Sequence, residues 1–564
     1  MKRVSKQLKA GTPILAIVLT ANPLLAEAAG PVAPGAGELL QQVKPVEPAP
    51  PSSTGKELKI EPEGAAPPPP SIAFEVKAIQ ITGNTVFDTA LLHALVMDGE
   101  GQSLTLIQLN GLAARITDYY RRHGYPLARA IIPAQKIEDG RVRIEVIEAR
   151  YGKIDLRNKS QVNDSLLNAT LSPLQSGQAI EQETLDRSLL LFSDIPGVAP
   201  GFTLKPGEAA GTSDLVVDAA PGPRFTGYVA LDNYGNAYTG RTHLGGAVNF
   251  INPLHHGDVL SVDGLSAGRG MSYGRIGYES LLNGRGTRMG GSYSALQYIL
   301  GDTFAPLEGH GTAQVGSLWI RHPLERSRSV NFYGQLQYDH KDLRDHLDLI
   351  DSRTDRRLDN GTAKLSGDLR DGLLSGGIST WNIAWTSGRV SFDDANAQLA
   401  DAATVKTQGS FSKFNAILVR LQNLGLNVSL YLAFSAQWAS KNLDPSEKMV
   451  AGGPYTVRAY DMGVLSGDDG YLGTAEIRYN LGLAGWGRYQ AVGFIDTQHV
   501  TVNKNSVAAG RNDASLTGAG VGIDCLWPGL WTARAYIATP IGATPELVAS
   551  AASVRAWAQI SKGF

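Results

Sequence analysis

The chain has 564 residues, and its 51 lysines and arginines nearly balance its 53 aspartates and glutamates, leaving a net charge of −2. At roughly 150 residues per domain, this length predicts three or four domains. The near-neutral charge argues against a nucleic-acid-binding protein, which needs a basic excess to displace phosphate counterions. The charged fraction of 18% and the 64 glycines exclude a charged, disordered chain. The single cysteine, Cys525, permits no intramolecular disulfide and no multi-cysteine metal site.

Residues 1–28 have the pattern of a secretory signal peptide. A basic segment within residues 1–9 precedes an apolar run at 14–20, and Ala26-Glu27-Ala28 forms a small-x-small cleavage site. A membrane anchor is the weaker interpretation, because the apolar run is shorter than the about 20 residues that a spanning helix needs. No later run reaches that length, so any membrane role must use strands or a surface contact.

Residues 29–72 are rich in proline, which predicts an extended linker. Inside it, residues 37–44 are able to form about two helical turns before Pro45 ends them. Two interpretations remain open for this segment. It is either a locally helical part of the linker or a short element that docks elsewhere in the protein, because a helix this short needs tertiary contacts to persist.

Two successive units of about 75 residues, 73–149 and 150–223, show the same predicted order of one strand, two helices and two strands, which indicates an internal repeat. The predicted elements are 74–82, 89–96, 104–123, 127–132 and 141–148 in the first unit, and 152–157, 163–171, 180–192, 201–205 and 214–219 in the second. Such small sheets leave open strand edges, which are able to receive an extended peptide. A plain spacer is the alternative interpretation.

Residues 224–564 show the period-two alternation of strands separated by Gly, Asn and Asp turns. In the last segment, Val554, Ala556, Ala558, Ile560 and Phe564 share one face. Strands cross lipid only as a closed barrel, so the pattern predicts a transmembrane antiparallel β-barrel. Sixteen strands of about 10 residues leave about 180 residues for 15 connections, although 14 or 18 strands fit nearly as well.

Several enzyme-like patterns lack their required context. Residues 264–268 match G-x-S-x-G, but they end a predicted strand with no helix after it. His255 and His256 lie in a turn without a third metal ligand at suitable spacing. The charged stretch 342–359 lacks calcium-loop spacing and is predicted to be a solvated connection. We therefore expect no enzyme activity, no metal site and no cofactor.

Specific strings in both repeats resemble the outer-membrane transporters of two-partner secretion (the TpsB class), in the superfamily that joins POTRA domains to a 16-stranded barrel. Residues 119–126 (YYRRHGYP) and 133–140 (PAQKIEDG) are similar to the first POTRA signature, although Ala149 stands where the family usually has Gly. Residues 194–198 (DIPGV) are similar to a string of the second. The resemblance assigns POTRA motif positions to Tyr120, Gly124, Tyr125, Pro133, Gln135, Asp139, Gly140, Pro196 and Gly197.

Residues 452–460 (GGPYTVRAY) resemble the family's VRGY loop, which folds back into the barrel lumen. Residues 494–498 (FIDTQ) resemble its F-x-D-x-G wall motif, with Ala459 and Gln498 in place of glycines. The resemblance implies a latch between Arg458 and Asp496, supported by the motif residues Gly453, Val457, Tyr460 and Phe494. A guanidinium is able to bind a carboxylate with two hydrogen bonds. In a wet lumen we expect the energy of an exposed pair, about 0 to 1 kcal/mol.

The resemblance implies a monomeric outer-membrane pore, with its POTRA domains in the periplasm, that exports a large unfolded partner of the haemolysin, adhesin or contact-dependent toxin type. The passenger would bind the POTRA domains in extended form, while outer-membrane lipid surrounds the barrel. The C-terminal strand ending at Phe564 would address the chain to the barrel-assembly machinery. The alternatives are a barrel-assembly factor of the same superfamily and, as a weaker candidate, a passive porin or plugged receptor.

Overall fold

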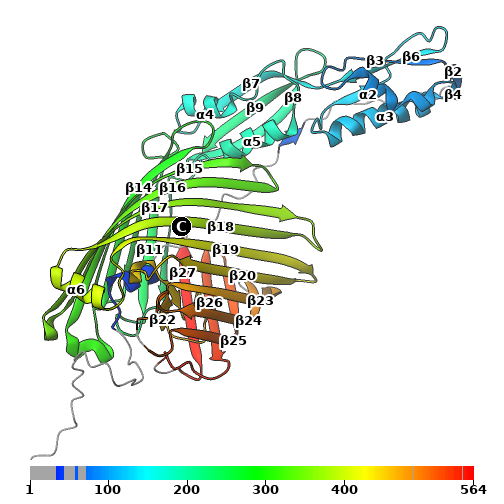
Figure 1. Ribbon diagram of the computed structural model, residues 1–564. Coiled ribbons are helices and arrows are strands. Elements are labelled where there is room, and N and C mark those ends of the chain that lie inside the picture. Colours follow the sequence, from blue (N-terminus) through cyan, green and yellow to red (C-terminus); the bar gives the residue numbers. More distant parts are fainter. Residues whose placement is uncertain (1–32, 44–57, 61–71, 485–486, 508, 549–550) are drawn as a thin grey trace, which may run out of the picture.

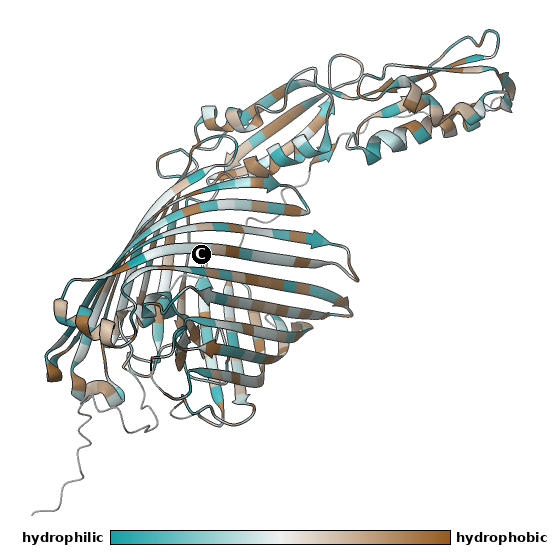
Figure 2. Ribbon diagram, in the orientation of Figure 1, coloured by the Kyte–Doolittle hydropathy of each residue, from teal (hydrophilic) through white to brown (hydrophobic). Residues whose placement is uncertain are grey.

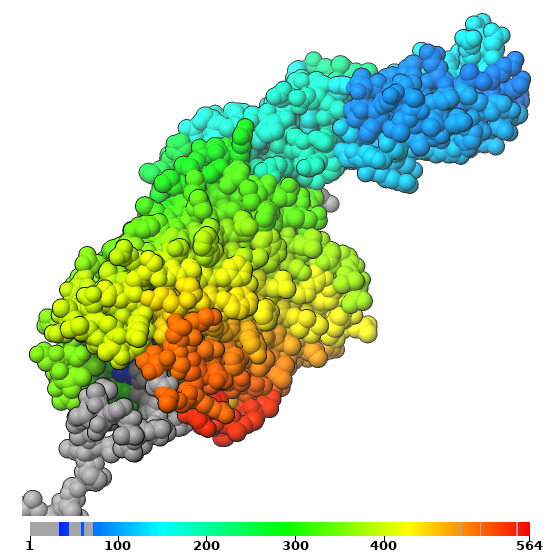
Figure 3. Space-filling model, viewed as in Figure 1, coloured from blue at the N-terminus to red at the C-terminus, as the bar shows by residue number. Residues whose placement is uncertain are grey.

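The computed structural model describes residues 33–43, 58–60, 72–484, 487–507, 509–548 and 551–564. A closed antiparallel barrel forms the main body, and two α/β units extend as an arm from one of its ends (Figures 1 and 3). The predicted signal peptide lies outside the described residues. Within these ranges, no helix combines the length and the apolarity required to cross a membrane.

The first α/β unit packs two helices against a small sheet of order β3-β6-β5, with β2 and β4 paired beside it. Thr105 and Gln108 form a capping box that begins α3, whose buried face includes Leu109 and Ile116. The single strand predicted at 74–82 is instead two strands, because β2 pairs with β4 whereas β3 pairs with β6. The elements are β2 Phe74–Val76, β3 Ala78–Thr82, α2 Thr89–Ala94, η1 Met97–Gly99, β4 Gln102–Leu104, α3 Leu106–Arg122, β5 Arg129–Ile131 and β6 Arg141–Ile147.

The second α/β unit has the sheet order β1-β8-β9-β7, with α4 and α5 in its core. Strand β1 is a piece of the linker that pairs in parallel with β8, Lys59 opposite Thr203 and Ile60 opposite Leu204. The elements are β1 Lys59–Ile60, β7 Arg150–Asn158, α4 Asp164–Leu171, α5 Gln182–Ser193, β8 Val198–Pro206 and β9 Thr212–Pro221.

The barrel contains 16 strands, so the predicted number is confirmed and the alternatives of 14 and 18 are excluded. The first and last strands, β10 and β27, pair to close it. The strands are β10 Phe225–Asp232, β11 His243–Ile251, β12 Val259–Ser266, β13 Met271–Leu281, β14 Arg288–Ile299, β15 Gly309–Arg326, β16 Val330–Leu347, β17 Ser352–Asp371, β18 Gly377–Phe392, β19 Gly409–Gly425, β20 Val428–Ala439, β23 Asp469–Ala484, β24 Gly487–Thr501, β25 Asp513–Trp527, β26 Trp531–Pro540 and β27 Arg555–Gly563. Short helices in the connections are η2 Asp302–Leu307, η3 Asp348–Ile350 and α6 Ala395–Ala403.

Hydrophobic and hydrophilic residues alternate along the barrel strands (Figure 2). Large apolar side chains such as Leu231, Leu318 and Leu336 are exposed on the outside, where they suit lipid. In the last strand, Trp557 is buried inside the barrel whereas Ile560 is exposed, as the alternation predicts.

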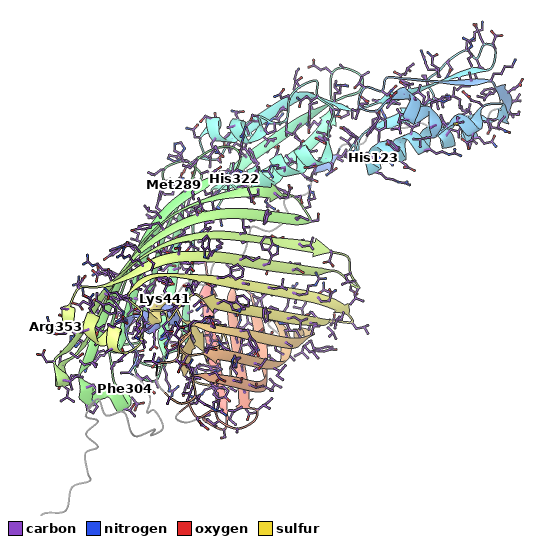
Figure 4. All side chains as sticks on the ribbon, in the orientation of Figure 1. His123, Met289, Phe304, His322, Arg353 and Lys441 are labelled. Carbon is purple, nitrogen blue, oxygen red and sulfur yellow. The ribbon has the colours of Figure 1, made fainter. Side chains whose placement is uncertain are left out.

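Strands β16 and β17 are 18 and 20 residues long, which is more than a membrane crossing needs. The prediction that 342–359 is a solvated connection is wrong, because the ladder continues through most of it and only 348–351 joins the strands. Charged side chains on these two strands pair there, as Arg356 does with Asp345 at 2.9 Å. Arg353 and Phe304 mark this end of the barrel, while His322 lies at the end nearest the α/β units (Figure 4).

Helix α1, Ala36–Gln42, lies inside the barrel. Leu39 and Leu40 are buried in one cluster with Leu296, Leu343 and Leu358 from the barrel wall. Of the two interpretations of this segment, docking within the protein is therefore correct. The helix begins one residue before the predicted segment, and Lys44 lies outside the described residues.

Candidate functional site in the barrel lumen

The connection between β20 and β23, residues 440–468, folds back into the lumen, and we call it the lumen loop. It contains η4 Pro445–Glu447 and the paired strands β21 Met449–Ala451 and β22 Leu465–Gly467. Gly452 and Gly453 both have positive φ, which lets the chain turn sharply before the motif. Val457, Ala459 and Tyr460 are almost fully buried against the wall.

Arg458 binds Asp496 on β24, as the resemblance implied. Its Nε and Nη2 atoms donate to the two Asp496 oxygens, each at 2.8 Å, and its backbone N–H donates to the same carboxylate at 3.2 Å. The side chains are only 6% and 1% exposed, so the small energy expected of an exposed pair does not apply. A buried pair with this geometry is expensive to break.

Arg458 makes three further contacts, one with the motif residue Phe494 and two with residues that the motifs do not contain. Glu476 on β23 accepts from its Nη1 atom at 2.7 Å, and the Phe494 ring lies 3.4 Å from its guanidinium carbon. On β27, the Trp557 indole N–H donates to the Arg458 carbonyl at 2.7 Å. The alternation of β23 and β27 places Glu476 and Trp557 on the lumen side, but only the strand register brings them to the loop tip.

Both departures from the family motifs have a structural explanation. Ala459 does not have a positive φ, so its backbone does not require glycine. Its Cβ fits because the facing residue on β25, Gly518, has no side chain. Gln498 is buried on β24 and donates to the Val450 carbonyl of the lumen loop at 3.0 Å. The Gln498 side chain therefore adds a contact that a glycine at this position could not make.

Helix α1 is held by the wall and by the lumen loop together. Asp345 on β16 accepts from the Ala36 N–H at 2.7 Å and so caps the helix from outside the segment. Gln41 donates to the Ser446 carbonyl, and Ser466 donates to Glu38 at 3.2 Å. The lumen loop thus contacts the helix through both of its ends.

Buried ion pairs fix the beginning of the lumen loop beneath this helix. Glu447 pairs with Lys341, and its other oxygen lies 2.8 Å from the Lys413 Nζ. Arg356 lies between Asp444 of the loop and Asp345, the residue that caps α1. These charges satisfy one another inside the lumen, and they join the helix, the loop and the wall into one network.

The first-unit motif residues support a buried carboxylate, Glu148, next to the junction between the two units. Glu148 accepts from the Thr85 N–H at 2.6 Å, the Val86 N–H at 2.7 Å and the Tyr120 hydroxyl at 2.9 Å. Burial alone would raise the pKa of Glu148, but these hydrogen bonds lower it below its ordinary value. Burial and the Glu148 charge raise the pKa of Tyr120. Tyr125 packs edge-on against Phe87.

The remaining first-unit motif residues shape turns. Gln135 exchanges two 2.8 Å hydrogen bonds with the Arg143 backbone and so continues along β6 the pairing that β5 ends at Ile131. The Gln135 side-chain amide also donates a longer hydrogen bond, at 3.4 Å, to the carbonyl of Pro133 two residues earlier. Asp139 and Gly140 both have positive φ, as an Asp-Gly hairpin turn requires, and Gly124 has positive φ after α3.

The second-unit motif lies against the barrel. Arg326 on β15, whose side chain is fully buried, binds both Asp194 oxygens at 2.7 and 2.8 Å. A Cβ at Gly197, the residue after Pro196, would lie 2.7 Å from the Cβ of Asn252 in the turn after β11. At the other end of the barrel sequence, Phe564 exchanges two 3.0 Å backbone hydrogen bonds with Gly227 and so completes the closing pair of strands.

The chain matches two family models. Residues 211–525 match the model described as "Haemolysin secretion/activation protein ShlB/FhaC/HecB", and residues 74–149 match "POTRA domain, ShlB-type". A relative from Haemophilus influenzae, "Heme/hemopexin transporter protein HuxB", is 27% identical over 477 residues, covering 83% of this chain and 84% of its own. "Outer membrane transporter CdiB" from Escherichia coli is 23% identical over 422 residues, covering 72% and 69%.

Two solved structures share the fold. CdiB from Escherichia coli superimposes with a TM-score of 0.69 at 21% identity, covering 93% of this chain and 94% of that one. CdiB from Acinetobacter baumannii gives a TM-score of 0.60 at 18% identity, covering 88% and 91%. At this level of identity, the likeness concerns the fold.

Proposed function

Because the chain belongs to the haemolysin secretion/activation family, the outer-membrane transporters of two-partner secretion, we propose that its lumen is the path of one large, unfolded partner protein. The observation that supports this is the occupied lumen. Helix α1 and the lumen loop fill it through side-chain contacts that reverse without breaking a covalent bond. The pore therefore holds its own movable contents, which a passenger would displace.

The passenger would first bind the two α/β units in the periplasm in extended form. Strand β8 of the second unit already accepts an extended peptide, since Lys59 and Ile60 of the linker pair along it. Main-chain hydrogen bonds at such an edge give affinity without demanding one sequence, which suits an unfolded passenger. An incoming segment that took the place of Lys59–Ile60 would also release the linker that leads to α1.

Movement would then run outward through the barrel as the Arg458 loop shifts. Folding of the passenger outside the cell would bury apolar surface, so its return through the pore would become unfavourable. No nucleotide binding is part of this scheme. The passenger is expected to be a haemolysin, an adhesin or a contact-dependent toxin. The resemblance to the family also implies a monomeric pore, which the barrel-assembly machinery would insert through the strand ending at Phe564.

The test is the extracellular proteome of the source bacterium with and without this gene. Without the gene, one large, β-rich protein should disappear from the medium. A strain whose transporter lacks residues 73–223 should fail to secrete the same protein. Intact secretion by that deletion variant would refute the role of the α/β units. A general fall in outer-membrane barrels would favour the assembly-factor alternative, whereas ion conductance alone would not separate these functions from a porin.

A further inference from the structure

Asp461, the residue after Tyr460 in the lumen loop, bridges two arginines that belong to opposite sides of the barrel's closing seam. Its Oδ1 atom accepts from Arg241 at 2.7 Å, and its Oδ2 atom accepts from Arg555 at 2.5 Å. Arg241 lies in the connection between β10 and β11, and Arg555 begins β27. One carboxylate of the loop thus joins the two strands that close the barrel.

The seam between β10 and β27 is short. The strands have 8 and 9 residues, and their register runs from Tyr228 opposite Gly563 to Asp232 opposite Gln559. Backbone bonds of Gly227 with Phe564 and of Asn233 with Ala558 extend the pairing by one residue at each end. By contrast, β16 and β17 pair along 18 residues of β16. A short ladder leaves few main-chain hydrogen bonds to keep the barrel closed.

At the end of the seam farthest from the α/β units, side chains continue the closure beyond the ladder. The Asn233 side chain accepts from the Ala558 N–H at 2.8 Å and donates to the Ala556 carbonyl at 3.1 Å. The Tyr234 ring packs edge-on against Trp557 of β27 and against Tyr455 of the lumen loop. The loop therefore touches this end of the seam both through Tyr455 and through Asp461.

We infer that Asp461 is a positioning residue that makes closure of the seam depend on the position of the lumen loop. While the loop tip is seated, the carboxylate accepts a hydrogen bond from each guanidinium group, offsets part of their mutual repulsion and ties them together. Within the described part of the chain, neither Arg241 nor Arg555 has another carboxylate at ion-pair distance. Departure of the loop leaves two cations facing each other across the seam, so its outer end loosens.

The inference is tested by locking the seam covalently. Ala230 and Ser561 are register partners with side chains on the lumen face. Since Gly227 and Phe564 exchange both backbone bonds, Ala230 and Ser561 form a non-hydrogen-bonded pair, whose Cα separation of about 4.5 Å suits a disulfide. The pair A230C/S561C is made in a C525S background, and the disulfide is formed in the inserted, full-length protein.

Asp461→Asn is expected to lower the temperature at which the folded barrel disappears in semi-native electrophoresis and to raise outer-membrane permeability to a large antibiotic. The oxidised seam disulfide should restore both properties. Arg241→Gln, at a half-exposed site that does not threaten insertion, should reproduce the defect, and D461N/R241Q should be no worse than D461N. D351N is the matched control, because that aspartate lies on the distant turn between β16 and β17.

Two results would overturn the inference. One is a D461N protein that matches D351N in both measurements, and the other is a D461N defect that the seam disulfide leaves unchanged. Neither measurement requires a passenger, so failure here is distinguishable from failure of the proposed export function.

Discussion

Replacing Asp496 by Asn should raise the population of molecules whose lumen loop has left the barrel wall by roughly two orders of magnitude. The carboxylate accepts from Nε, Nη2 and the backbone N–H of Arg458, and the two side chains are 1% and 6% exposed. Removing one partner of a buried pair costs about 3–5 kcal/mol. Glu476 stays 2.7 Å from the guanidinium, so the lower end, about 3 kcal/mol, applies. At about 1.4 kcal/mol per tenfold, this is about a 100-fold rise in the open population.

The assay is the alkylation rate of a single cysteine at Val457 by a bulky hydrophilic maleimide, in a C525S background. Val457 is fully buried, so V457C reacts only when the loop leaves the wall. D263N serves as the control, because that wall carboxylate pairs with Arg275 instead of the loop. If D496N and D263N were alkylated at the same rate, the Arg458–Asp496 contact would not hold the loop.

Three further substitutions probe separate contacts. Glu148→Gln should destabilise the first α/β unit, because about 1–3 kcal/mol is lost for a buried donor left unpaired. Because the pKa of Glu148 is lowered, its contribution to stability is complete above about pH 4.3 and is lost as the pH falls through the lowered pKa. The protection factors of the α3 amides, corrected for the intrinsic pH dependence of exchange, should therefore depend on pH there in the wild type only. Gly37→Leu should raise single-channel conductance, since a Cβ there would lie 2.7 Å from the Ser446 nitrogen and would expel α1. Gly518→Val should speed V457C alkylation as D496N does, because a Cβ at residue 518 would lie 2.3 Å from the Ala459 Cβ and would push the loop tip off the wall. An unchanged rate would contradict the contact between Ala459 and residue 518.

The barrel is predictable from the sequence because lipid imposes a strict rule on strands. One face must be apolar wherever the wall meets lipid, so alternation identifies the closed sheet. The rule ends where the wall leaves the membrane. Residues 342–359 carry charges on both faces, a pattern typical of a loop, yet Asp345 and Arg356 form an ion pair across a ladder that continues there. Hydropathy does not record such cross-strand charge pairing.

The site was predictable only where a motif carried it. Arg458 and Asp496 were identified by resemblance to known strings, whereas Glu476 belongs to no such string. Its place depends on the register of β23 against β24, which sets Thr474 opposite Asp496 and Glu476 opposite Phe494. A slip of two residues would keep Glu476 on the lumen side but move it away from Phe494, and the alternation of β23 does not distinguish these registers. Likewise, the helical propensity of residues 37–44 does not specify the cavity that receives them.

The two alanines that replace family glycines should respond in opposite ways when glycine is restored. Ala149 has φ of +30°, a conformation that costs an L-residue about 1–2 kcal/mol, whereas glycine adopts it freely. After the extra entropy of glycine in the unfolded chain, about 0.4–1 kcal/mol, A149G should stabilise the region by about 0.5–1 kcal/mol. Hydrogen exchange of α4 and α5 would measure this gain, because the Ala149 side chain packs in the core of the second unit.

Ala459 has an ordinary backbone conformation, and its Cβ packs over Gly518. A459G relieves no strain, loses that contact and adds about 0.5–1 kcal/mol of backbone entropy to the released loop, so V457C alkylation should become several-fold faster. The same residue type therefore has opposite effects because one φ is positive and the other is not. If both substitutions stabilised their regions, the backbone angles would not be the reason that alanine is tolerated at residue 459.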